Sequence, residues 1–155
     1  MISYDIRWAT CEDWQPTMEM VWKTFMKFEA GDYTREGIAN FHEFITNGMI
    51  YHMFLEGRYP MLVVLDGEKI IGQISTRNGN RISLLFVDEA YHRQGIGTEL
   101  IHRMSKYLKE EKKQRSVSIM AAPYAVGFYG RLGFNALSGE EAFSGIRVTP
   151  MEKSL

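Results

Sequence analysis

Residues 81–113 read RISLLFVDEAYHRQGIGTELIHRMSKYLKEEKK, and the fold can be worked out from this stretch. Residues 82–87 form a short apolar run rich in strand-forming types, which predicts a buried strand. After a glycine-bearing segment at 92–98, apolar side chains recur at helical spacing over 100–108. A strand therefore leads into a glycine-bearing loop that opens a helix. Such a loop directs several backbone N–H groups and the positive end of the helix dipole to one point, which favours an anion.

The loop does not match the two commonest nucleotide motifs. It lacks the Lys-Ser/Thr ending of a P-loop, so a triphosphate with magnesium is disfavoured. Its glycines fall at Gly95 and Gly97, with Leu100 where a dinucleotide site needs a third glycine, and no acidic residue follows at the required distance. A turn that needs glycine only for tightness remains an alternative at this point.

A second block follows the same plan. Residues 117–121 (VSIMA) predict another buried strand, and PYAVGFYGRLGF follows at 123–134. Gly133 stands where a helix ends, a position that often requires a positive φ. Two strand–loop–helix units therefore come one after the other.

Together the two blocks resemble the GNAT superfamily of acetyl-CoA-dependent N-acetyltransferases. That family's loop reads Gln or Arg, two variable residues, Gly, one variable residue, then Gly or Ala; here HRQGIG at 92–97 matches, with His92 in the first position. The family's second signature is Ala, then Tyr four residues later, then Leu-Gly-Phe. Ala125, Tyr129 and residues 132–134 match it, while Ala122 replaces a frequent Asn. The resemblance spans roughly residues 61–151.

The resemblance implies an α+β fold with a mixed, mostly antiparallel six- or seven-stranded sheet, helices on both faces and a splayed central strand pair. We expect one domain over 1–155, with 1–59 as a first strand plus a helical acceptor-side region and 60–155 as the sheet core with the coenzyme site. Residue patterns predict the same order of elements. They predict a strand at 4–8, helices at 10–28, 36–45 and 49–55, strands at 61–65 and 69–75 around an Asp66-Gly67 turn, and a closing hairpin that ends at 146–151.

The chemistry of acetyl transfer assigns roles to some of these residues. An amine that attacks a thioester creates an oxyanion and then a thiolate. A backbone N–H of residues 85–87 can polarise the carbonyl if a bulge frees it from the sheet ladder, and the resemblance implies such a bulge. It also implies that Tyr129 is the general acid, since a phenol with a pKa near ~10 is a competent donor to a thiolate whose thiol has a pKa near ~8.5. The expected coenzyme-binding residues are Leu85, Phe86, Val87, His92, Arg93, Gln94, Gly95, Ile96, Gly97, Thr98, Tyr124 and Tyr129.

The base is left open by the sequence. An amine with a pKa near ~10 must lose a proton before it attacks. The candidates by type are Glu29, His42, Glu43, His52, Asp88 and Glu89, and a water chain would serve as well. The aromatic residues of the first third either pack as core or line an acceptor pocket of apolar character.

Composition limits the possible partners. The chain has 155 residues, a formal net charge of -1 and a single cysteine, Cys11. This charge gives no electrostatic footprint for nucleic acid or an anionic membrane, and one cysteine forms neither an internal disulfide nor a cysteine metal cluster. No apolar run approaches membrane length, and the N-terminus lacks a basic start followed by an apolar segment. We expect a cytoplasmic protein without a metal.

The sequence therefore predicts transfer of an acetyl group from acetyl-CoA, as co-substrate, to a primary amine on a small molecule or peptide. The acceptor, the use of other acyl groups and the choice between monomer and homodimer stay open. A non-catalytic acyl-CoA-binding regulatory domain is one alternative. A nucleotide- or phosphate-binding module is another, which the absent P-loop lysine disfavours.

Overall fold

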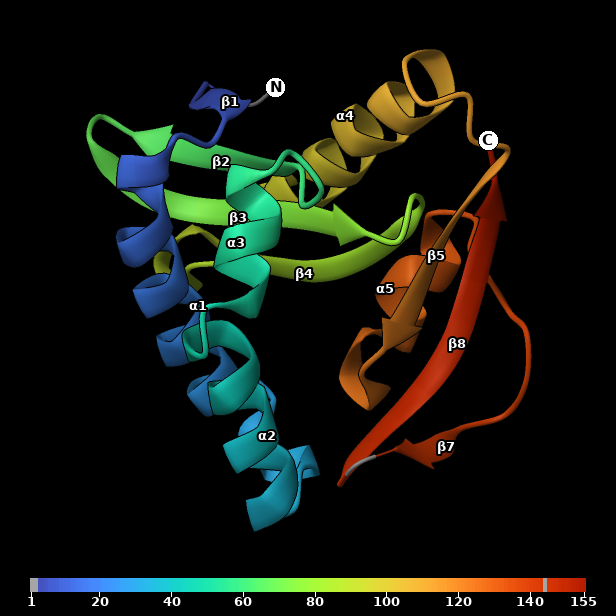
Figure 1. Ribbon diagram of the computed structural model, residues 1–155. Helices are drawn as coiled ribbons and strands as arrows, with labels where there is room; N and C mark the ends of the chain where they lie inside the picture. The colour runs from blue at the N-terminus through green and yellow to red at the C-terminus, as the bar shows by residue number, and fades with distance from the viewer. Residues whose placement is uncertain (1–2, 144) are drawn as a thin grey trace.

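The computed structural model describes residues 3–143 and 145–155. Figure 1 shows helices packed around one twisted sheet. The strands are β1 (Asp5–Trp8), β2 (Met61–Asp66), β3 (Lys69–Arg77), β4 (Arg81–Val87), β5 (Ser116–Ala121), β6 (Asn135–Ala136), β7 (Glu141–Phe143) and β8 (Ile146–Ser154). The helices are α1 (Trp14–Phe28), α2 (Arg35–Thr46), α3 (Met49–Leu55), α4 (Ile96–Glu110) and α5 (Val126–Arg131). Short 3-10 turns lie at η1 (Cys11–Asp13), η2 (Ala30–Asp32), η3 (Glu89–Tyr91) and η4 (Pro123–Ala125).

The sheet has the predicted mixed character. Its order is β1-β2-β3-β4-β5-β8-β6, with β7 paired to β8. Every pair is antiparallel except β4–β5, which is parallel. The described residues form eight strands rather than the expected six or seven, because β6 and β7 contain only two and three residues and are too short to show alternation.

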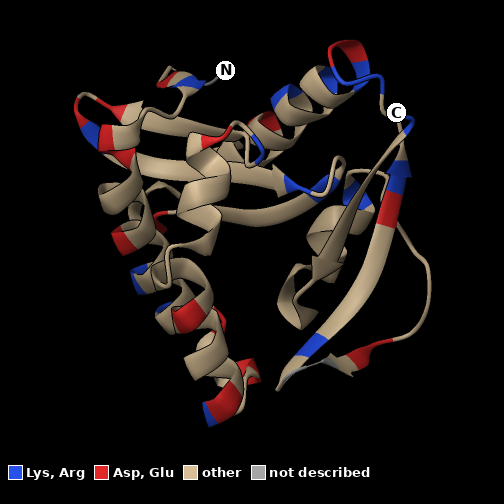
Figure 2. Cartoon of the chain, viewed as in Figure 1, with Lys and Arg blue, Asp and Glu red and all other residues tan. Residues whose placement is uncertain are grey.

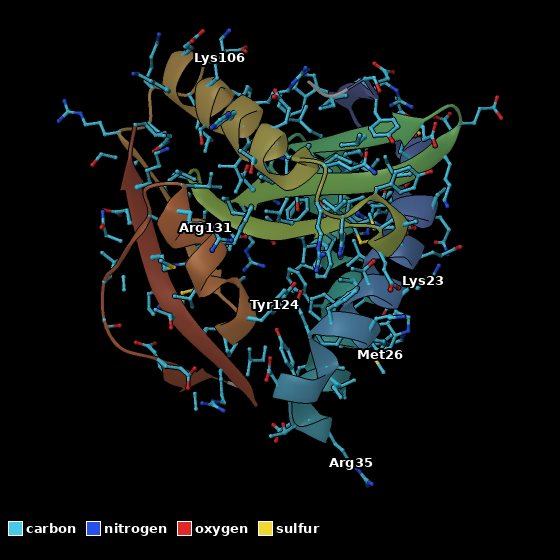
Figure 3. All side chains as sticks on the ribbon, turned by 180° about the vertical axis from the view of Figure 1, so that it is seen from behind. Lys23, Met26, Arg35, Lys106, Tyr124 and Arg131 are labelled. Carbon is cyan, nitrogen blue, oxygen red and sulfur yellow. The ribbon has the colours of Figure 1, made fainter. Side chains whose placement is uncertain are left out.

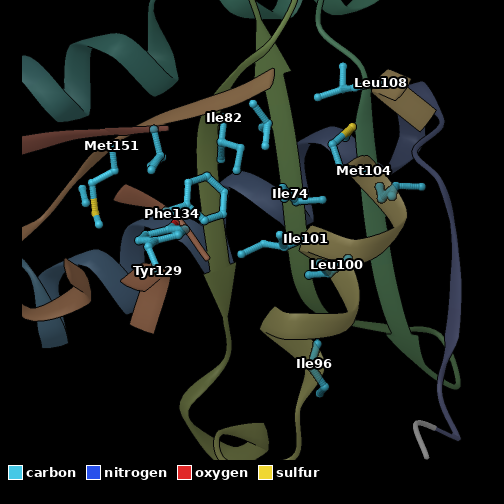
Figure 4. Close-up of a cluster of buried hydrophobic side chains, with 14 of the residues drawn as sticks. Ile74, Ile82, Ile96, Leu100, Ile101, Met104, Leu108, Tyr129, Phe134 and Met151 are labelled. Atoms are coloured by element: carbon cyan, nitrogen blue, oxygen red, sulfur yellow. The ribbon is translucent and has the colours of Figure 1, made fainter. Parts of the chain in front are cut away.

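Helices cover both faces of the sheet, as expected. Helices α1, α2 and α3 contribute to an apolar cluster on one face, while α4 and α5 contribute to a cluster on the other. In α4 the buried positions recur at a spacing of three or four residues, which is what places them on one side of a helix. Figure 4 shows the second cluster, where Tyr129 and Phe134 lie beside Ile82 and Met151.

Strands β4 and β5 diverge soon after they meet. They pair only at Arg81–Ser118 and Ile82–Ile119, and beyond these pairs the two ribbons run apart in Figure 1. This is the splayed central pair that the sequence predicted. Beyond Ile82, no strand among the described residues pairs with the edge of β4 that faces β5.

The bulge in β4 lies earlier than we expected. The β3–β4 register shifts between Ser75 and Thr76, which leaves Ser83 as the extra residue, whereas the expected position was 85–87. A buried tyrosine holds this bulge: the Tyr59 hydroxyl donates to Ser83 Oγ at 2.8 Å and accepts from Ser75 Oγ at 3.0 Å. Burial raises the pKa of Tyr59 to about 12, so the hydroxyl keeps its proton for this network. The sequence gives no local sign of this contact because Tyr59 lies far from Ser83 along the chain.

The β7–β8 turn packs closely on the start of α2. The Thr34 backbone N–H donates to the Gly145 carbonyl oxygen at 3.1 Å. A Cβ on Gly37 would lie 2.4 Å from the same carbonyl oxygen, a distance that no side chain tolerates. Glycine at position 37 therefore permits the contact between the two backbones.

Figure 2 shows both charge signs on α1, α2, α4 and β8, and both signs also gather near the end of α4. In the part of the chain that the structure describes, no helix combines the length and apolar character needed to span a membrane.

Candidate active site

A cavity of about 720 Å³ lies where β4 and β5 diverge. Its size falls within the usual range for a small-molecule site. It is lined by residues that follow α1 and precede α2, and by parts of α2, β4, η3, the loop before α4, the first turn of α4, the end of β5, η4 and α5. Two parts of its lining matter most. We call His92, Arg93 and residues 95–98 the loop wall, and we call Tyr33, Phe41, Phe86 and Tyr124 the aromatic wall.

The loop wall presents backbone donors. Gly95 caps α4 with a φ of 80° and Arg93 has a φ of 63°, so two left-handed residues turn the chain into the helix. The first N–H groups of α4, including those of Gly97 and Thr98, have no partner inside the helix and face the cavity's lining. A Cβ on Gly97 would already lie 3.4 Å from the Phe128 ring, so glycine keeps the backbone at this position accessible to a ligand. These features are those that favour the binding of an anion.

His92 holds the loop against the end of β4. Its Nε2 lies 2.6 Å from the Val87 carbonyl oxygen. Because a carbonyl oxygen only accepts, Nε2 carries the hydrogen in this bond. The ring also contacts Phe28, with centroids 5.1 Å apart.

Gln94 differs from the other predicted coenzyme-binding residues. Its side-chain oxygen accepts from the Tyr4 hydroxyl at 3.0 Å, and it does not line the cavity. Only its backbone is therefore placed to serve a ligand in the loop. The other predicted residues all line the cavity together.

Tyr129 comes from α5 and is 5% exposed. Its ring packs edge-on against Phe134, with centroids 5.3 Å apart. Burial raises its pKa well above the ordinary value, and the charge of Glu29 and the Tyr124 hydroxyl act in the same direction. Among the described residues, none forms a hydrogen bond with its hydroxyl. The phenol therefore keeps its proton across neutral pH and has no protein group competing for it.

The aromatic wall surrounds one carboxyl group. Glu29 follows the last turn of α1, and burial raises its pKa to about 7, with a smaller contribution from Asp32. The nearby Tyr124 hydroxyl can donate to this carboxyl, an interaction that opposes the rise of the Glu29 pKa. Figure 3 shows Tyr124 between η4 and the region of α1 and α2. The pKa of Tyr33 is also raised, chiefly by burial and then by Glu29. The pKa of Tyr124 is raised by partial desolvation of its hydroxyl and then by Glu29, although the residue as a whole is 58% exposed.

Sequence reasoning missed several residues of the cavity. Tyr33 and Phe41 show only as apolar positions of the first third, and nothing local separates them from core residues. Arg131 adds an exposed cation from α5, and it follows the Tyr129 signature closely enough to have been found. Glu29 was one of six open candidates.

Known proteins share this architecture. The profile of the acetyltransferase (GNAT) domain matches residues 29–155. A GCN5-related N-acetyltransferase from Rhodopseudomonas palustris superposes with a TM-score of 0.85 at 22% identity, over 100% of this chain and 98% of the other. PaiA N-acetyltransferase from Thermoplasma acidophilum, in complex with coenzyme A, gives a TM-score of 0.83 at 19% identity, over 99% and 100% of the two chains. No curated protein matches the sequence.

The profile match covers most of the chain, so the protein belongs to the GNAT acetyltransferase family. The solved structures share its fold from end to end. The assignment to this family that the sequence suggested is thereby confirmed.

Proposed function

We propose that this protein transfers an acetyl group from acetyl-CoA to a primary amine by direct attack within a ternary complex. The observation that carries the proposal is a single cavity that joins the loop wall, Tyr129 and the aromatic wall around the unpaired edge of β4. An anion-binding loop and an aromatic pocket on one cavity suit two substrates that must meet. The complex of PaiA with coenzyme A supports the choice of donor.

The residues present fit coenzyme A. The N-terminus of α4 offers backbone N–H groups to a pyrophosphate, and Arg93 and Arg131 add positive charge on the same cavity. Bound acetyl-CoA would supply the acetyl group in activated, thioester form. The free edge of β4 at Leu85, Phe86 and Val87 would hold the ligand's pantetheine arm by backbone hydrogen bonds. His92 lines the cavity and also fixes the loop through the Val87 carbonyl oxygen, whereas Gln94 acts only by fixing the loop.

Tyr129 is placed to act as the general acid. Its hydroxyl stays protonated throughout the physiological range and its burial fixes the ring, while the raised pKa makes it a weaker acid than a free phenol. A proton donor held beside the leaving thiolate lowers the barrier to its departure.

The test is a thiol-release assay with acetyl-CoA and a panel of primary amines: an alkylamine, 2-phenylethylamine, a polyamine, an aminoglycoside and a peptide with a free N-terminus. We expect at least one amine to raise thiol release far above the rate without acceptor, with the acetylated amine found by mass spectrometry. Tight coenzyme binding without transfer to any amine would favour the regulatory alternative instead.

We also propose that residues 1–155 work as one domain, in which 1–59 supply Glu29, Tyr33 and Phe41 and 60–155 supply the loop wall. The acceptor is a small-molecule or peptide amine. A cytoplasmic location and a monomeric or homodimeric state stay predictions.

A further inference from the structure

The six candidate bases occupy very different places in the fold. Asp88 accepts a hydrogen bond from the Ala90 backbone N–H at 3.1 Å, which caps the η3 turn. Glu89 is exposed and forms an ion pair with Lys27 at 3.0 Å. Neither carboxylate lines the cavity.

The remaining candidates on α2 and α3 also lie elsewhere. His42 packs against Trp22, with ring centroids 4.7 Å apart, and lines a separate groove between α1 and α2. Glu43 and His52 are exposed and line no part of the cavity. Of the six, Glu29 alone lines it.

Titratable groups from several elements influence the charge of Glu29. Asp32 on η2 and Tyr33 after it act on the carboxyl from its own side, while Tyr124 on η4 and Tyr129 on α5 act from across the cavity. Among the described residues, no Lys, Arg or His forms an ion pair with Glu29. Its negative charge is therefore left for a cation that comes from outside the protein.

We propose that Glu29 is the catalytic base, whose carboxylate binds the acceptor's ammonium group within the aromatic wall and takes the proton that must leave the nitrogen before attack. The inference rests on the proposed function, since it assigns a role within acetyl transfer. The neighbouring rings of Tyr33 and Phe41 suit the same cation, because aromatic faces attract an ammonium group.

The proton balance of this step is simple. One N–H bond of the ammonium breaks, one O–H bond forms on Glu29, and the freed lone pair becomes the nucleophile. Glu29 later releases this proton to solvent. When the tetrahedral intermediate collapses, the Tyr129 hydroxyl gives its proton to the leaving thiolate, and the second N–H proton that the nitrogen loses restores the hydroxyl. The step needs no further reactant.

The environment of Glu29 makes the transfer feasible. Moving a proton from an amine of pKa about 10 to a solvated carboxylate of pKa about 4.3 is disfavoured by roughly 10⁶-fold. With the Glu29 pKa raised to about 7, the deficit falls to roughly 10³-fold. Glu29 is still ionised at pH 8, so the base form is present where the acceptor is an ammonium ion.

The test compares Glu29→Gln with wild type in single-turnover reactions, using the best amine from the panel. We expect the chemical rate to fall by roughly 10²–10⁴-fold, the usual contribution of one acid–base group, with coenzyme A affinity unchanged. The matched control is Glu89→Gln, which removes an exposed carboxylate outside the cavity and should keep the wild-type rate.

A pH profile separates a base from a residue that only positions the amine. In wild type, kcat/KM should rise with pH to a plateau above about 7, and Glu29→Gln should lose this limb. Tyr124→Phe removes a hydrogen bond that lowers the Glu29 pKa, so the limb should move to higher pH.

Three results would overturn the inference. A Glu29→Gln protein within about threefold of wild type in the chemical step would remove Glu29 from the mechanism. A large loss with an unchanged acidic limb would assign the limb to another group and leave Glu29 as a positioning residue. A wild-type protein that acetylates no amine would overturn the proposed function itself, whereas the first two results would leave that function standing.

Discussion

The two walls of the cavity are built in different ways. The loop wall comes from one short segment of the chain, within residues 92–98, and its ligand groups are the backbone N–H groups of a helix start. The aromatic wall is made of side chains from the segment before α2, α2, β4 and η4, which come together only in the folded chain. One wall therefore depends on local backbone geometry, and the other depends on tertiary packing.

This difference indicates which wall recognises a chemical group shared by many ligands and which wall recognises one particular ligand. Backbone groups at a helix start recognise any phosphate of suitable shape, so the loop wall suits a donor shared by many enzymes. Side chains such as Glu29 and Tyr124 set charge, proton affinity and shape, so the aromatic wall is expected to determine the acceptor. Changes to one wall should therefore leave the function of the other intact.

The largest expected effect concerns Tyr129, which serves both substrates. Tyr129→Phe keeps the ring and its packing against Phe134 but removes the only proton that the residue can donate. The chemical rate should fall by roughly 10²–10⁴-fold with coenzyme affinity little changed. Single-turnover measurements avoid masking by product release. A rate within about threefold of wild type would leave the proton to solvent or to the acceptor's own ammonium.

The next prediction compares how stability depends on pH through Glu29 and through Asp13, the acidic residue just before α1. The folded-state pKa of Glu29 is raised from 4.5 to about 7, so the folded state holds an extra proton between these values and loses stability as pH rises through them. Glu29→Gln should therefore become more stable relative to wild type over this range, by up to about 3 kcal/mol at pH 8. Chemical denaturation at several pH values measures this change.

Asp13→Asn should show the opposite sign. Asp13 accepts from Arg7 at 2.6 Å and from the Thr10 backbone N–H at 2.7 Å, and its pKa is lowered from 3.8 chiefly by the Arg7 hydrogen bond. Its stabilisation is present above pH 3.8 and disappears as pH falls through the lower folded-state value. Because Arg7 is partly exposed, we expect a loss of only about 1–2 kcal/mol near neutral pH. If Glu29→Gln and Asp13→Asn changed the free energy of unfolding in the same direction, the opposite pKa shifts assigned to the two residues would be contradicted.

Gly97→Val tests whether the loop wall holds the coenzyme. The new side chain would crowd Phe128 and cover the backbone that a phosphate must approach. Coenzyme A affinity should fall about tenfold or more, equivalent to about 1.4 kcal/mol, while the melting temperature changes little. Gly139→Val is the control, because a Cβ there meets nothing within 4 Å. Equal affinity in a folded Gly97→Val protein would place the phosphates elsewhere.

The smallest effect is expected from Gly37→Ala near the aromatic wall. The added methyl group would press on the Gly145 carbonyl, so α2 and the β7–β8 turn must move apart. We expect a stability loss of about 1 kcal/mol and a higher KM for the acceptor, with the Kd of coenzyme A unchanged. Gly31→Ala is the matched control in the preceding turn, since its Cβ meets nothing within 4 Å. An equal rise in the KM of the acceptor and in the Kd of coenzyme A would mean that the two walls are coupled.

The contrast between the walls also explains what the sequence could predict. Gly95, Gly97 and Tyr129 stand in short patterns whose geometry is local, so the loop, the helix that follows and the proposed acid were all accessible. The Asp66-Gly67 turn and the helical stripes were accessible for the same reason. Glu29 could not be chosen among six candidates, because its distinguishing property is its place beside Tyr124, a contact made only after folding. The bulge at Ser83 escaped prediction because Tyr59 fixes it from a distance.

The most direct test of the account is a thermal-shift titration of the wild-type protein with coenzyme A, with ATP as the comparison ligand. If the loop wall is a coenzyme site, binding at a hundredfold excess over Kd should stabilise the folded state by about 2.7 kcal/mol, while ATP stabilises it less. An unchanged melting temperature at millimolar coenzyme A would contradict the assignment of this cavity to acetyl transfer.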